Sequence, residues 1–115
     1  MLRVWNKTRS TLVADRADVA DTSAKRRQGL LKHSGLQPGE GLWISPCESV
    51  HSFFMKFEID VVYLDKKKRV VKIRPSMKLW RVSACLRAHS VLELPAGQCQ
   101  ATETSVGDEL EFERT

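Results

Sequence analysis

Hydrophobic positions along this chain recur mainly with the period of two that is typical of β-strands. Leu2–Asn6 alternates apolar and polar residues, and Thr11–Ala14 follows after a polar stretch, which predicts an opening hairpin. Val61–Leu64 and Val70–Ile73 flank a turn of basic residues and predict a second hairpin, which ends at Pro75. Further short strands are expected over residues 42–44, 90–94 and 109–113.

One segment has helical character, over about residues 24–33. Asp21, Thr22 and Ser23 precede it, and a side-chain oxygen from any of them can cap the first N–H groups. The basic residues 25–27 fall in the first turn, where they oppose the helix dipole. We therefore expect something anionic near this turn to offset their charge.

These elements predict a mainly β fold: a compact, small β-barrel-like domain of short, mostly antiparallel strands with one α-helix. The chain has 115 residues, which is the size of one domain, so residues 1–115 are assigned to a single domain. Residues 76–89 keep neither period and are expected to form an irregular covering segment. Residues 98–103 are expected to contain a short helical turn.

The composition indicates the cellular compartment of the protein and the chemical state of its cysteines. No apolar run approaches the roughly 20 residues of a membrane span, and the N-terminus has no signal-peptide pattern, so we expect a cytoplasmic protein. The alternative is a secreted protein whose signal peptide has been removed, because its sequence would look the same. Cys47, Cys85 and Cys99 are odd in number and have no CxxC spacing, which favours free thiols over disulfides or a zinc site. We assign no cofactor, no metal ligands and no catalytic residues.

The stretch from His51 to Lys56 is the best candidate for a ligand site. As a strand, it would place His51, Phe53 and Met55 on one face and the residues between them on the other, so that both faces mix polar and apolar groups. Arg26, if it turns toward this strand, would add a fork for a carboxylate or a phosphate. The expected ligand is a small anionic or carbohydrate-like molecule or the end of a peptide. The candidate ligand-binding residues are Arg26, His51, Ser52, Phe54, Met55 and Lys56.

Basic charge is concentrated in one part of the chain. The net charge is +5, and residues 66–87 carry nine Lys or Arg and no acidic residue. A solvated strand pair explains this segment most simply, and nucleic-acid binding is the alternative. The candidate residues for that alternative are Lys66, Lys67, Lys68, Arg69, Lys72, Arg74 and Trp80.

A second alternative is a hydrolase that depends on Cys47 and His51. Their spacing of four residues would pair thiol and imidazole on a helix. Pro46 and the surrounding strands indicate extended chain instead, in which the two residues would lie about 13 Å apart. We therefore expect a binding module without enzymatic activity. Asp108 is interpreted as a turn residue whose side chain binds nearby backbone N–H groups.

Several short motifs occur along the chain in a fixed order. They are Lys25-Arg26-x-x-Gly29-Leu30-Leu31, Gly39-x-Gly41-Leu42, His51-Ser52-Phe53-Phe54-Met55-Lys56, Ile59-Asp60-Val61-Val62-Tyr63-Leu64-Asp65, Val91-Leu92-Glu93-Leu94-Pro95-Ala96-Gly97 and Val106-Gly107-Asp108. This series resembles the uncharacterised bacterial and archaeal family called domain of unknown function 192, over residues from about 20 to 112. The resemblance implies a small, mostly β domain with one helix after the first strands, and no established reaction, cofactor or partner.

The sequence departs from the pattern of that family at a few positions. Phe57-Glu58 stands where the family usually has Asn-Thr, Phe54 where Trp is common, and Leu31 where Met is usual. If the Asn-Thr pair supplies hydrogen bonds to a site, that site is altered in this chain. Arg26 matches the pattern.

Overall fold

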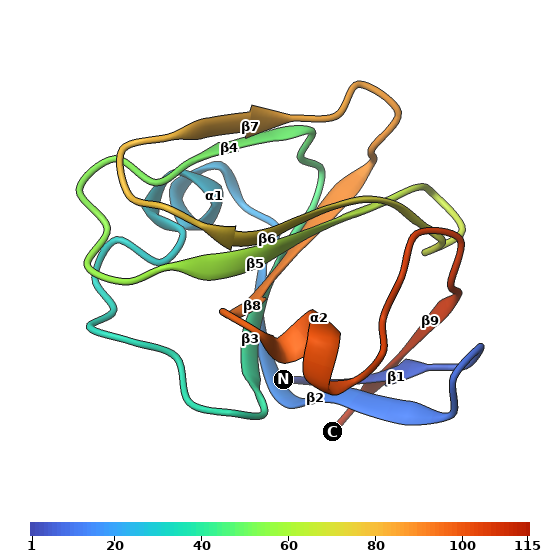
Figure 1. Cartoon of the computed structure of the whole chain (residues 1–115). Coiled ribbons are helices and arrows are strands. Elements are labelled where there is room, and N and C mark those ends of the chain that lie inside the picture. The colour runs from blue at the N-terminus through green and yellow to red at the C-terminus, as the bar shows by residue number, and fades with distance from the viewer.

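The computed structural model describes residues 1–115 as one curled β-sheet, a small second sheet and two short helices (Figure 1). The strands are β1 (Leu2–Asn6), β2 (Thr11–Ala20), β3 (Glu40–Ile44), β4 (Ser49–His51), β5 (Ile59–Leu64), β6 (Val70–Met77), β7 (Val82–Ala84), β8 (Ser90–Pro95) and β9 (Leu110–Arg114). The helices are α1 (Ser23–Gln28) and α2 (Gln98–Ala101). Neither helix is long and apolar enough to cross a membrane.

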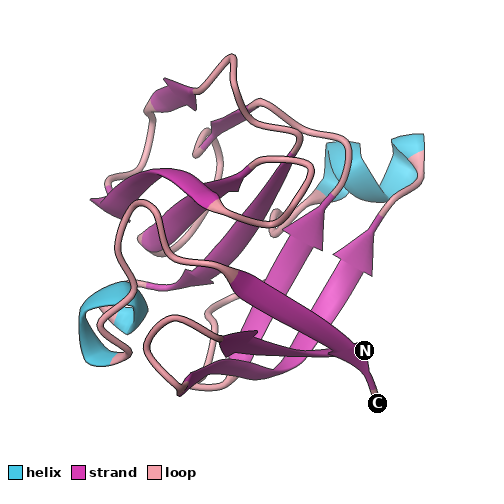
Figure 2. Ribbon diagram, turned by 90° about the vertical axis from the view of Figure 1, so that its right-hand side faces the viewer, coloured by secondary structure: helices cyan, strands magenta, loops and turns pink.

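The large sheet has the order β6-β5-β8-β3-β2-β1-β9, and its strands are antiparallel except for the parallel pair β2–β3. The sheet curls until its two edge strands approach each other (Figure 2). Where they meet, the Val70 N–H donates to the Asp108 carbonyl and the Gly107 N–H donates to the Val70 carbonyl, both at 2.8 Å. The result is a half-barrel, which confirms the predicted mainly β, barrel-like fold.

Two hydrophobic clusters lie on opposite faces of the central strands. Val62 and Leu64 of β5 and Leu92 and Leu94 of β8 point into the half-barrel. The alternate residues of these strands, among them Tyr63, pack on the other face beneath α1, β4 and the segment that leads to β7. All six residues of β5 are buried, because both faces of this strand are covered.

Both predicted hairpins are confirmed, as are the strands over residues 42–44 and 90–94 and the helical turn at α2. The prediction that Pro75 ends the second hairpin is wrong, because β6 continues to Met77. At that point β6 is the outermost strand of the sheet, where a residue without an N–H is tolerated. The segment 76–89, predicted to be irregular, contains the short strand β7.

The helix α1 forms where predicted but is shorter. The Thr22 hydroxyl caps it by accepting the Lys25 N–H at 3.2 Å. It ends at Gly29, whose φ of 48° lies in the left-handed region and whose N–H donates to the Lys25 carbonyl. Because α1 has only six residues, its three basic residues lie in the last turn, where the helix dipole favours them. The prediction that these basic residues oppose the helix dipole is therefore wrong. No anionic group is needed to offset their charge.

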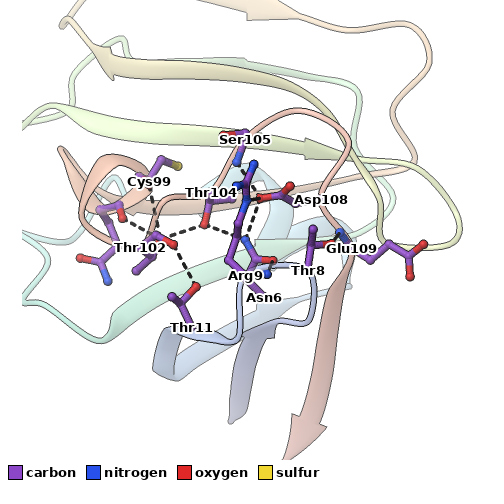
Figure 3. A network of polar contacts seen from close by, with 11 residues as sticks. Asn6, Thr8, Arg9, Thr11, Cys99, Thr102, Thr104, Ser105, Asp108 and Glu109 are labelled. Atoms are coloured by element: carbon purple, nitrogen blue, oxygen red, sulfur yellow. Dashed lines mark hydrogen bonds and ion pairs between the residues drawn. The ribbon is translucent and has the colours of Figure 1, made fainter.

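A polar network joins the start and the end of the chain (Figure 3). The Asp108 carboxylate accepts hydrogen bonds from Asn6 Nδ2 at 2.9 Å and from the Ser105 N–H at 2.9 Å, and it pairs with Arg9 Nε at 3.3 Å. Burial alone would raise the pKa of Asp108, but these three donors outweigh burial and lower the pKa. The interpretation of Asp108 as a turn residue whose side chain binds nearby backbone is confirmed for the Ser105 N–H, whereas the contacts with Asn6 and Arg9 were not expected.

Candidate functional site

A pocket of about 310 Å³ lies between α1 and β4, and we call it the α1–β4 pocket. Its volume is at the low end of the range of small-molecule sites, roughly 300–1,000 Å³. Side chains from α1, β4, the loops beside them and the central strand β8 line it. The polar or reactive ones are those of Ser23, Arg26, Arg27, Gln28, Cys47, Ser49, His51 and Glu93.

Glu93 is the feature that most sets this pocket apart. Alternation along β8 sends Leu92 and Leu94 into the half-barrel and turns Glu93 to the opposite face, under α1 and β4. The residue is 4% exposed, and its carboxyl accepts no hydrogen bond from the protein. Burial raises the pKa of this carboxyl to about 7. A buried acid group therefore lines the pocket without a partner.

Arg26 reaches the pocket from α1 and is half-buried. Its guanidinium donates to the Asp21 carbonyl at 3.3 Å and to the Ser23 hydroxyl at 3.4 Å. These contacts are with its own helix and the residues before it, so they hold the side chain at the edge of the pocket. Arg27 lines the pocket beside it, and the two arginines make this edge cationic.

Cys47 and His51 line the same pocket, Cys47 from the loop before β4 and His51 from the end of β4. The Cys47 thiol donates to the Ser49 carbonyl at 3.1 Å. Burial is the largest influence on this thiol and raises its pKa, and the nearby Glu93 also raises it, while Arg26 lowers it. A catalytic thiol needs a lowered pKa, so the environment of Cys47 does not favour a nucleophile.

The expected strand from His51 to Lys56 is wrong beyond its first residue. β4 ends at His51, and the chain then turns, with Phe54 at a φ of 65°. The two predicted faces therefore do not exist. Within the turn, Met55 lines the α1–β4 pocket, whereas Phe54 and Lys56 are exposed outside it.

Ser52 anchors this turn instead of facing the pocket. Its hydroxyl donates to the Lys78 carbonyl at 2.6 Å and accepts the Arg81 N–H at 2.9 Å. It is buried, and its contacts join the turn after β4 to the segment before β7. Of the six predicted ligand-binding residues, the fold thus brings three together at the pocket, namely Arg26, His51 and Met55.

A row of aromatic rings extends outward from His51. His51 stacks on Phe53 with ring centroids 5.1 Å apart, Phe53 stacks on Trp80 at 5.7 Å, and Phe54 meets Trp80 edge-on at 4.8 Å. Phe54 is 73% exposed and Trp80 is 55% exposed. Trp80 also has a positive φ of 61°, so two bulky residues hold strained backbone here.

The basic segment 66–87 extends from the β5–β6 turn along β6, Lys72 and Arg74 included, to the residues that follow this strand. Lys66, Lys67 and Arg69 lie around a hollow at the β5–β6 turn, and Arg69 is paired with Glu109 at 3.0 Å. Trp80 lies beyond the far end of β6, which is about 26 Å long at 3.3 Å per residue. Between these ends, Lys72 Nζ donates to the Ala84 carbonyl at 2.7 Å. No three His, Cys, Asp or Glu side chains are grouped where they could hold a metal ion.

Sequence reasoning missed Glu93, the most distinctive residue of the pocket. The signal was present, because Glu93 interrupts the apolar run Val91–Leu94 in a predicted strand. A charged residue between two leucines in a buried strand is uncommon unless it is paired or functional. The sequence alone does not show that α1 and β4 lie above Glu93 and make it part of a pocket.

The fold and the pocket define a class of protein, namely a small half-barrel β domain with a ligand-sized hollow beside a short helix. The chain belongs to the family of domain of unknown function 192, described as "Uncharacterized ACR", whose model matches residues 4–112. The curated relatives are UPF0127 proteins. One from Pyrococcus abyssi is 32% identical over 116 residues, covering 95% of this chain and 96% of the relative. One from Thermococcus sibiricus is 32% identical over 117 residues, covering 94% of this chain and 73% of the relative.

Two solved structures share the fold. A protein of unknown function from Novosphingobium aromaticivorans matches with a TM-score of 0.82 at 19% identity, covering 96% of this chain and 82% of that one. A "putative transcription regulator" from Sinorhizobium meliloti matches with a TM-score of 0.83 at 19% identity, covering 96% of this chain and 91% of that one. At this identity the likeness establishes the common fold.

Proposed function

We propose that this protein is a non-enzymatic binding module whose ligand enters the α1–β4 pocket. The observation that carries the proposal is Glu93, a buried carboxyl that lines the pocket and has no hydrogen-bond partner in the protein. Burial disfavours the ionised form of this carboxyl, and a ligand that donates hydrogen bonds to it from within the pocket would favour that form. Carboxyl groups whose pKa is raised by burial and that line a pocket are concentrated at functional sites.

The other pocket residues support a polar ligand of modest size. Arg26 and Arg27 offer donors to an acidic or hydroxyl-bearing group at the edge, while Met55 supplies apolar contact. The carboxyl of Glu93 disfavours an anionic group deep in the pocket, so any acid group of the ligand belongs at the arginines.

The alternatives have weaker support. A hydrolase would require an activated Cys47, and burial raises the pKa of that thiol. Nucleic-acid binding through residues 66–87 would require free basic side chains, but Arg69 is paired with Glu109 and Lys72 is bound to the Ala84 carbonyl. We therefore place both below ligand binding in the pocket.

The test is a binding screen monitored by the thermal midpoint and by amide chemical shifts. Sugars, organic acids, amino acids and short peptides are each added at millimolar concentration to the wild type, Glu93→Gln, Arg26→Ala and Lys66→Ala. Lys66 is an exposed basic residue outside the pocket and is the control for Arg26. We expect ligand-induced shifts that Glu93→Gln reduces at least fivefold and Lys66→Ala leaves unchanged. Shifts equal in all four proteins, or absent with every compound class, would contradict the proposal.

A further inference from the structure

The strand that borders the α1–β4 pocket has an unused edge. β4 belongs to the two-stranded sheet and pairs only with β7. The Cys85 N–H donates to the Glu48 carbonyl at 2.8 Å, and the Ser52 N–H donates to the Arg81 carbonyl at 2.9 Å. In an antiparallel pair, every second residue makes these bonds. The backbone groups of Ser49 and His51, which lie between the bonded positions, therefore point away from β7.

Ser49 and His51 are also exposed and line the pocket. The Ser49 carbonyl accepts the Cys47 thiol, but the remaining outward groups of these two residues have no partner strand. An open edge of this kind accepts an extended peptide as an additional strand, with main-chain hydrogen bonds as the source of affinity. α1 lies across the pocket from β4, so such a peptide would lie in a groove between a strand edge and a helix.

The buried carboxyl identifies which end of a peptide enters first. Glu93 lines the same pocket as this edge and is buried without a partner. The group that best complements a desolvated carboxylate is a cation with several N–H donors, and a peptide begins with an α-ammonium group of this kind. A peptide carboxylate would instead be repelled by Glu93 and belongs near Arg26 and Arg27.

From these contacts we propose that the α1–β4 pocket binds the amino-terminal end of a peptide. The α-ammonium group pairs with the Glu93 carboxylate, and the extended chain that follows pairs with the outward backbone groups of Ser49 and His51. This inference rests on the proposed function and names its ligand class. A free small amine shares the ammonium group but has no backbone to place along β4.

The experiment compares amidated trialanine, its N-acetylated form and alaninamide by amide chemical-shift titration at pH 7. We expect trialaninamide to shift resonances of residues 47–51 and 93, and the N-acetylated peptide, which lacks the charge, to bind at least tenfold more weakly. Glu93→Gln should reduce the affinity for trialaninamide by at least tenfold, whereas the control Glu58→Gln, at an exposed residue, should not. Equal binding of the acetylated peptide would overturn the ammonium contact.

The strand contact has its own test, which requires no change in the protein. N-methylation of the second or the third alanine removes one N–H at a time from trialaninamide. Because N–H groups alternate in direction along a strand, one of the two peptides should lose affinity and the other should retain it. Equal affinity of both methylated peptides and of alaninamide would overturn pairing with β4. Binding of a sugar or an organic acid that depends on Glu93 would overturn this inference while leaving the proposed function standing.

Discussion

At the scale of single residues, two buried carboxyl groups of this protein differ in what surrounds them. Asp60 is 1% exposed, and its carboxylate accepts the N–H groups of Ser76 at 2.8 Å, Gly97 at 3.1 Å and Cys99 at 2.9 Å. These donors come from β6 and from the start of α2, so Asp60 holds two segments against β5. Glu93, by contrast, holds no protein group. The first residue stabilises the fold, and the second is available to a ligand.

The role of Asp60 leads to a prediction about stability. In Asp60→Asn, one acceptor oxygen is replaced by an amide donor, so at least one of the three N–H groups is left buried and unpaired. We expect the free energy of unfolding to fall by about 2–3 kcal/mol, measured by urea denaturation. Asp21→Asn, at an exposed residue, is the control and should change stability by less than about 0.5 kcal/mol. Equal stability of the two variants would contradict the structural role of Asp60.

At the scale of elements, the contact between β3 and β8 determines the position of Glu93. Gly41 of β3 faces this strand so closely that a Cβ atom there would lie 3.0 Å from the Glu93 carbonyl oxygen and 3.2 Å from Leu94 Cδ2. The carbonyl belongs to a central strand and cannot move aside as a flexible side chain would. The glycine in the Gly39-x-Gly41 motif is therefore a requirement of close strand packing at this point.

We therefore expect Gly41→Ala to destabilise the protein by about 1–3 kcal/mol and to shift the amide resonances of β8, because the added methyl group pushes β3 and β8 apart. Gly35→Ala is the matched control, since a Cβ atom at Gly35 would meet nothing within 4 Å. Thermal unfolding and amide spectra of the two variants provide the comparison. If Gly41→Ala is as stable as Gly35→Ala, the close approach of the two strands is not a constraint on the sequence.

Among the secondary-structure elements, the sequence predicts the hairpins well but not the turn after His51. Hairpins were predictable because each side shows a hydrophobic run next to a turn, and both signals are local. The turn after His51 was not, because its aromatic residues look like those of a strand. The turn is held by the contacts of Ser52 with Lys78 and Arg81, which lie 26 and 29 residues further along the chain. Such a non-local contact leaves no periodic signal.

At the scale of the whole molecule, the mainly β class and the barrel-like curl could be predicted from short strands separated by turns. The parallel pair β2–β3 and the closure through Val70 and Asp108 could not, because they depend on which strands meet in space. The candidate site was partly predictable. Arg26, His51, Met55 and Glu93 all belong to motifs of the sequence. The motif of Glu93 has the pattern of a buried strand, so its place in the pocket depends on the position of α1 over β8.

Buried carboxyl groups also determine how the stability of the whole molecule depends on pH. The lowered pKa of Asp108 contributes stability that is present above its unfolded value, near 3.8, and is lost as the pH falls through the folded pKa. The raised pKa of Glu93 acts in the opposite direction. The unfolded chain ionises near pH 4.5 and the folded protein near pH 7, so stability is lost as the pH rises between these two values. The two groups together favour mildly acidic conditions.

We therefore expect the free protein to be less stable at pH 8 than at pH 5, by about 2–3 kcal/mol from Glu93 alone. Glu93→Gln cannot ionise at this position and should remove most of the difference, while Glu58→Gln, an exposed residue, should retain it. Urea denaturation of the three proteins at both pH values measures the effect. If Glu93→Gln lost as much stability between pH 5 and pH 8 as the wild type, ionisation of Glu93 would not be the cause of the loss. A bound ammonium group, by contrast, should restore stability to the wild type at pH 8, because it pairs with the carboxylate that burial otherwise disfavours.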